Sequence, residues 1–81
     1  MTKQEFRNSK EYDYCVNKIR NYHKGFEFTI PFYKMNKGQK NAMHVVLDDC
    51  KKEGLIESIG IDYSMEDLLT LESTAETWKR L

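Results

Sequence analysis

The chain has 81 residues, of which 40% are hydrophobic and 32% charged, with 13 basic and 13 acidic side chains. These values are ordinary for globular proteins and exclude a disordered chain, and the length fits one domain, residues 1–81. So small a scaffold rarely forms a deep, water-excluding cleft, which favours binding over catalysis. We therefore expect no enzyme activity and no small-molecule substrate.

Motifs for chemistry are missing from the sequence. No nucleophile with an oriented base, glycine-rich phosphate loop or paired metal-ligand spacing is recognisable, so we expect no catalytic residue, cofactor or metal. Cys15 and Cys50 fall on the apolar sides of predicted helices, which indicates reduced, buried thiols. Without a secretory signal or an apolar stretch of about 20 residues, the sequence predicts a cytoplasmic protein with no membrane partner.

Charge is distributed unevenly along the chain. Residues 1–44 hold nine basic and four acidic residues, a net charge of +5, and residues 45–81 hold four basic and nine acidic residues, a net charge of −5. If the two halves separate in space, the first attracts phosphates and the second repels them. The alternative is that the fold interleaves the charges.

The first half predicts a helix followed by a short strand. Residues 1–8 are largely polar, and we expect them to be loose. From Ser9, a predicted N-cap, apolar residues recur at steps of three and four as far as Gly25, which predicts an amphipathic helix. Residues 26–32 alternate apolar side chains with period two and predict a short strand, which Pro31 confines to a sheet edge.

A second amphipathic helix is predicted over residues 37–53. Asn36 and Gln39 have the spacing of a capping box at its start, and Gly54 ends it. The predicted apolar stripe consists of Ala42, Met43, Val46, Leu47 and Cys50.

The C-terminal third leaves two alternatives. Residues 55–61 predict a strand. In the first alternative, residues 68–71 pair back as the second strand of a hairpin, and residues 73–81 form a short final helix with its own capping box. In the second, residues 65–81 form one long helix. This stretch is rich in serine and threonine, which are poor interior helix residues, and that favours the hairpin.

Residues 41–56 resemble the recognition helix and first wing strand of winged helix-turn-helix domains. In that family the helix ends in a charged residue, a glycine and an apolar pair, as at residues 53–56, and a Leu-Thr step precedes the last helix, as at residues 69–70. The resemblance covers residues 10–81 and is to the small phage and mobile-element type of Gram-positive bacteria. It implies an α+β fold of helix, short strand, helix, β-hairpin wing and short C-terminal helix.

Two features depart from the family pattern. Residues 30–35 leave room for a turn at most, where a usual member has a complete helix, so the first half of the helix-turn-helix is degenerate. The predicted wing tip carries Asp62, Glu66 and Asp67, whereas a wing that approaches a phosphate backbone is ordinarily basic.

The resemblance implies a small DNA-binding accessory or regulatory protein that acts as a dimer. The outward side of the second helix carries side chains of the types that contact phosphates and adenine edges. The candidate nucleic-acid-binding residues are Lys37, Gln39, Lys40, Asn41 and His44 on this helix and Lys18, Arg20 and Lys24 on and after the first helix. The competing interpretation is an ordinary solvated surface.

The alternative function is a protein-interaction domain that modulates a host or replication enzyme without binding DNA. An edge strand that ends at a proline leaves backbone groups open to another chain, including a second copy. The candidate interface anchors are Phe28, Phe32, Tyr33 and Trp78. The competing interpretation is that these rings pack in the core. The DNA hypothesis requires that Lys37, Lys40 and His44 are not covered by the chain itself.

Overall fold

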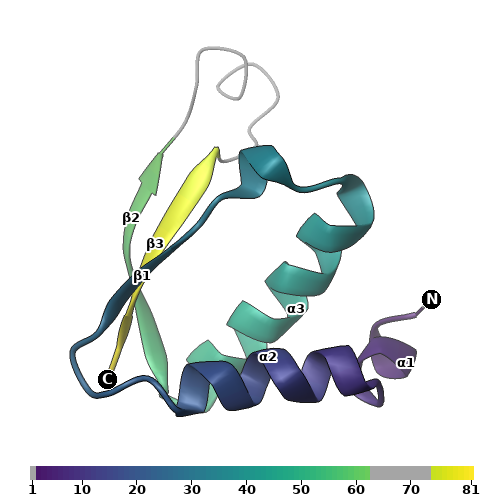
Figure 1. Ribbon diagram of the computed structural model, residues 1–81, viewed down its shortest axis with the longest axis horizontal. Coiled ribbons are helices and arrows are strands. Elements are labelled where there is room, and N and C mark those ends of the chain that lie inside the picture. The colour runs from purple at the N-terminus through teal and green to yellow at the C-terminus, as the bar shows by residue number, and fades with distance from the viewer. Residues whose placement is uncertain (1, 63–73) are drawn as a thin grey trace.

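The computed structural model describes residues 2–62 and 74–81, which form three α-helices, one 3-10 turn and a three-stranded antiparallel sheet (Figure 1). The helices lie to one side of the sheet, so this part of the chain is a small α+β domain. None of the helices within it is long and apolar enough to cross a membrane.

The first predicted long helix is confirmed as α2 (Lys10–Arg20). Ser9 caps it, because the Ser9 hydroxyl accepts a 3.2 Å hydrogen bond from a backbone amide of the first turn. Val16 and Ile19, on the apolar side of the helix, are buried. Gly25 then turns the chain with φ +87°, a left-handed conformation that glycine adopts without strain.

The second predicted long helix is confirmed as α3 (Lys37–Lys52). Its capping box is complete, since the Asn36 side chain accepts from the Gln39 amide at 2.8 Å and the Gln39 side chain accepts from the Asn36 amide at 3.0 Å. Gly54 follows the helix with φ +75°. The side chains that α3 buries are Val45, Val46, Leu47 and Cys50.

Between these helices the chain forms the predicted short strand and a single turn. Strand β1 (Glu27–Ile30) lies at an edge of the sheet and stops before Pro31. The 3-10 turn η1 (Phe32–Lys34) is the single turn that the sequence predicted for residues 30–35. Phe32 is buried, so the turn is anchored in the core.

The C-terminal segment is the centre of the sheet, which corrects our prediction for it. Strand β3 (Ala75–Arg80) pairs antiparallel with β1 on one side and with β2 (Ile56–Asp62) on the other. The predicted final helix over residues 73–81 is wrong for residues 75–80, and so is the alternative of one long helix over residues 65–81.

Long-range pairing explains why this segment is a strand. The backbone amides and carbonyls of β1 and β2 need hydrogen-bond partners. Because β3 lies between these two strands, it supplies partners to both. Thr77 and Trp78 suit a pleated strand, and Trp78 is buried by the packing of the helices on the sheet. Residues 68–71, predicted as the other hairpin strand, lie outside the described residues.

Polar side chains stand in register on the face of the sheet that points away from the helices. Thr29 and Thr77 lie opposite each other, with their hydroxyl oxygens 3.0 Å apart. Lys79 stands in register between Glu27 on β1 and Glu57 on β2. Because side chains alternate along a strand, the neighbouring positions of β1 and β3 point inward to the core.

The core lies between the helices and the sheet. Its buried members are Val16, Ile19, Phe32, Val46, Leu47, Cys50, Ile56 and Trp78. They come from α2, η1, α3, β2 and β3, so the packing of this one cluster fixes how those elements sit against each other.

The N-terminal residues, which we expected to be loose, contain the short helix α1 (Lys3–Arg7). The hydroxyl of Thr2 caps this helix by accepting from the Glu5 amide at 3.1 Å. No residue of α1 is buried. The position of this helix therefore depends on partly exposed side chains.

Trp78→Ala tests whether the C-terminal strand contributes to the core. Removal of the buried indole leaves a cavity, so we expect the free energy of unfolding to fall by about 3–5 kcal/mol. Tyr33→Ala removes a ring that is 61% exposed, and we expect a change within about 0.5 kcal/mol. Urea unfolding followed by circular dichroism measures both values. Similar losses in the two variants would contradict the placement of Trp78.

Candidate functional site

The outward side of α3 carries the main group of candidate residues. Lys37, Asn41 and His44 are exposed and, at steps of four and three residues, lie on one side of the helix. Lys40 is half-buried. Gln39 is exposed, but its amide oxygen accepts the capping hydrogen bond, which leaves its amino group for a ligand. Lys37 and His44 therefore face solvent, and Lys40 does so in part.

An aromatic neighbour holds His44 in one orientation. The imidazole stacks on the ring of Phe32, with the ring centroids 4.6 Å apart and the planes inclined by 14°. Phe32 is 1% exposed and is therefore fixed by the core. The stack therefore restricts the orientation of the His44 imidazole.

The candidate bases on and after α2 differ in their surroundings. Lys18 and Lys24 are exposed. Arg20 donates to Glu53 across a 2.9 Å ion pair in which each side chain is 49% exposed. A surface pair of this kind contributes little to stability. It does neutralise the charge that Arg20 offers to a phosphate.

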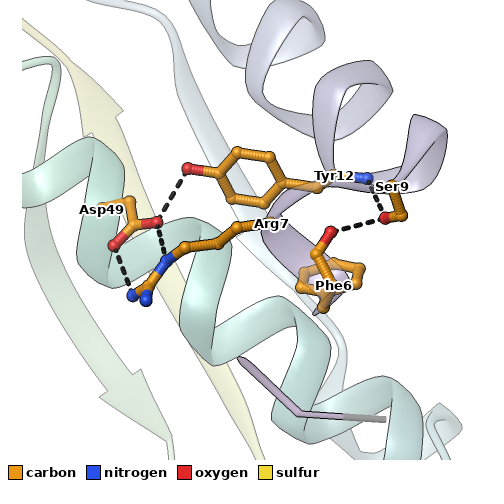
Figure 2. Close-up of polar contacts among 5 residues, drawn as sticks. All are labelled: Phe6, Arg7, Ser9, Tyr12 and Asp49. Atoms are coloured by element: carbon orange, nitrogen blue, oxygen red, sulfur yellow. Dashed lines mark hydrogen bonds and ion pairs between the residues drawn. The ribbon is translucent and has the colours of Figure 1, made fainter. Parts of the chain in front are cut away.

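A polar cluster that the sequence analysis missed joins the three helices (Figure 2). Arg7 of α1 donates twice to Asp49 of α3, from Nε to Oδ2 at 2.8 Å and from Nη2 to Oδ1 at 3.0 Å. The hydroxyl of Tyr12, on α2, donates to Oδ2 of the same carboxylate at 2.7 Å. Two-point contacts between a guanidinium and a carboxylate are geometrically specific. The cluster therefore determines where α1 lies.

Both acidic members of this cluster have shifted pKa values. The hydrogen bond from Arg7 is the main reason that the pKa of Asp49 lies below its ordinary value, and the bond from Tyr12 acts in the same direction. Burial, followed by the hydrogen bond to Asp49, raises the pKa of Tyr12 to about 12. At neutral pH Asp49 is ionised and Tyr12 is protonated, as the hydrogen bonds require.

Little in the sequence indicates this cluster. Arg7 and Asp49 are 42 residues apart, and both are residue types of ordinary solvated surfaces. One signal is the position of Asp49 next to Cys50, which belongs to the predicted apolar stripe. A carboxylate so close to the core needs a partner, but the sequence does not say which one.

A groove separates α1 from α3. It has a volume of about 520 Å³, and we call it the α1–α3 groove. Its lining consists of Thr2, Lys3, Phe6, Arg7, Gly38, Asn41, Ala42, His44, Val45 and Asp48. Two of the candidate residues of α3, Asn41 and His44, therefore share a groove with Lys3 of α1.

A second hollow, of about 600 Å³, lies on the other side of Phe6, between α2 and the first half of α3. Its lining is mostly apolar and consists of Phe6, Glu11, Cys15, Lys34, Met35, Asn36, Gly38, Gln39, Ala42, Met43 and Val46. Methionine side chains adapt to ligands of different shape. This hollow suits an apolar group better than a phosphate.

The opposite charges of the two halves of the sequence are interleaved where the helices meet. The two ion pairs described above, Arg7 with Asp49 and Arg20 with Glu53, each join a base of the first half to an acid of the second half. The first half of the chain therefore does not present its whole excess of positive charge to a ligand.

The four predicted interface anchors fall into different environments. Phe32 and Trp78 are buried, which makes them core residues rather than surface anchors. Phe28 is half-buried, with its ring centroid 5.1 Å from that of Tyr22. Tyr33 is exposed, and the ammonium of Lys34 lies 5.7 Å from its ring centroid. Of the four, Tyr33 is the one that a partner reaches without a change in the core.

Neither cysteine has the surroundings of a reactive thiol. Cys15 is half-buried and Cys50 is buried, and both are free thiols. Burial raises the pKa of both, that of Cys50 to about 11. Both are therefore protonated at neutral pH, which disfavours nucleophilic attack and metal binding. Within residues 2–62 and 74–81, no group of three or more potential ligands is placed to hold a metal ion.

Comparisons with protein-family models, with curated proteins and with solved structures give no match.

Asp49→Asn tests the three-helix cluster through its pH dependence. A carboxyl group whose pKa is lowered by folding stabilises the protein above its unfolded-state pKa, near 4, and this stabilisation is lost as the pH falls through the lower folded-state value. We expect the variant to be less stable than the parent by about 1–3 kcal/mol at pH 7. The difference should shrink as the pH falls from about 5 to about 2.

The free energy of unfolding, measured in urea at several pH values, checks this prediction. Asp48→Asn is the matched control, because Asp48 is exposed on the same helix turn, and it should change the stability at pH 7 by no more than about 0.5 kcal/mol. A difference between Asp49→Asn and the parent that stays constant down to pH 2 would show that the charge of Asp49 is not what stabilises the cluster.

Proposed function

We propose that this chain is a DNA-binding accessory or regulatory protein of winged helix-turn-helix type, in which α3 enters the major groove. The observation that carries the proposal is the exposed row of Lys37, Asn41 and His44 on a helix whose opposite side is fixed in the core. The element order agrees with the resemblance for helix α2, strand β1, helix α3 and a following pair of antiparallel strands, although strand β3 stands where the resemblance implies a short C-terminal helix.

The dimensions of this row suit a reading surface. His44 lies seven residues after Lys37, which corresponds to about 10 Å along the helix axis. That length matches about three base pairs of B-form DNA. Asn41 stands between them with an amide that can pair with the N6 and N7 atoms of adenine, while Lys37 is suited to a phosphate.

The scaffold also limits how far the surface can move. The capping box fixes the first turn of α3, and the stack on Phe32 fixes His44. A reading residue held in place by its own protein loses less entropy when it binds. The first half of the helix-turn-helix motif is degenerate, and η1 takes its place. Its buried residue, Phe32, connects this turn to the core.

One observation favours the alternative, a protein-interaction domain. Ile59 and Ile61 are 43% and 44% exposed, and both lie on β2, an edge strand of the sheet. Exposed apolar residues on an open edge suit a protein partner or a second copy of the chain. The two functions are compatible, because a domain of this size has modest affinity for DNA alone and commonly binds it as a dimer.

Lys37→Ala and Asn41→Ala test the DNA-binding proposal. The parent should bind a mixed-sequence duplex at low salt, and its affinity should fall as the salt concentration rises. Lys37→Ala should weaken binding to all sequences and reduce the slope of log K against log salt by about 1. Asn41→Ala should cost about 1–3 kcal/mol for the preferred sequence and relax the choice of base at one position.

Fluorescence anisotropy with the mixed duplex, and with sequences selected from a random pool, measures these effects. Lys79→Ala is the matched control, since it removes one lysine from the far face of the sheet, and it should leave the affinity close to that of the parent. If the parent shows no salt-dependent binding to any duplex at low ionic strength, the proposal is wrong and the protein-interaction alternative stands.

A further inference from the structure

The short helix α1 occupies an unusual place beside the proposed reading surface. It forms one wall of the α1–α3 groove, and Asn41 and His44 contribute to the opposite wall. Lys3, on the α1 side, is exposed. An ammonium group, an amide and an imidazole therefore line one groove from two separate helices.

One polar and one apolar side chain, both partly exposed, hold α1 in this place. No residue of α1 is buried. Arg7 reaches Asp49 with two hydrogen bonds, and Phe6 meets the ring of Tyr12 edge to face at 5.6 Å between centroids. Arg7 is thus the residue that attaches α1 to α3, while Phe6 packs it against α2.

We propose that α1 is an arm that contacts nucleic acid, and that the α1–α3 groove holds one phosphodiester strand. In this arrangement Lys3 contacts a phosphate from one wall, while Asn41 and His44 on the other wall are directed to the bases of the same stretch of the strand. The inference rests on the proposed function, and it assigns to α1 a role that the winged helix-turn-helix resemblance, which begins at residue 10, does not include.

Charge and exposure indicate that α1 contacts the nucleic acid and does not cover the outward side of α3. Lys3 is the groove residue of α1 whose charge is complementary to a phosphate, because Arg7 is already paired with Asp49. The acid of the groove, Asp48, lies one helical turn beyond His44 on α3. A cover that blocks the reading surface would bury Asn41 and His44, yet both remain exposed beside α1.

The full-length chain with single substitutions tests the proposal, with the mixed-sequence duplex at about 20 mM salt as the probe. Lys3→Ala should weaken binding about three- to tenfold and reduce the salt slope by about 1. Arg7→Gln should weaken binding at least as much, because it releases the arm. Adding Lys3→Ala to Arg7→Gln should then have little further effect, since residues that act as one unit are not additive.

Thermal unfolding by circular dichroism must show that each variant is folded at the binding temperature, and Lys79→Ala again serves as the lysine control. Parent-like affinity for Lys3→Ala, while Lys37→Ala still weakens binding, would overturn the role of the arm and leave the proposed function intact. Tighter binding by Arg7→Gln would also overturn it, because α1 would then be a cover. Absence of binding by the parent would overturn both proposals.

Discussion

The burial of one side of α3 is the constraint on which the rest of the structure depends. Val46, Leu47 and Cys50 are each at most 1% exposed and belong to one cluster with Trp78 of the central strand. A helix anchored along one side cannot rotate about its axis without exposing that apolar surface. The direction in which Lys37, Asn41 and His44 point is therefore a consequence of core packing.

Local signals were sufficient to predict α2, β1 and α3, although they did not predict the short helix α1. Ser9 and Asn36 accept the capping hydrogen bonds that their positions predicted, and Gly25 and Gly54 adopt the left-handed conformation expected at helix ends. Residues 75–80 differ because two local patterns compete there, and the serine- and threonine-rich stretch to which they belong permits both a capped helix and a strand. The open edges of β1 and β2, which are distant in sequence, decide in favour of the strand.

The candidate site shows the same division between local and long-range information. Helical spacing alone places Lys37, Asn41 and His44 on one side of α3, because the periodicity that predicts the helix also predicts its outward residues. The attachment of α1 by Arg7 joins positions 42 residues apart and has no periodic signature. Aromatic residues are ambiguous for another reason. In so small a domain a ring can fill the core or anchor a partner, and burial assigned Phe32 and Trp78 to the core.

The ion pairs that hold the helices together also shape what the surface offers to a ligand. Asp49 and Glu53 neutralise Arg7 and Arg20, so the positive charge near α3 comes mainly from lysines at its two ends, while Asp48 stands between them. An acidic side chain on the outward side of α3 repels phosphates, and in the proposed complex it would accept a hydrogen bond from the amino group of cytosine in the major groove. The proposed DNA contact would therefore be weaker where it depends on phosphates alone than where it depends on bases.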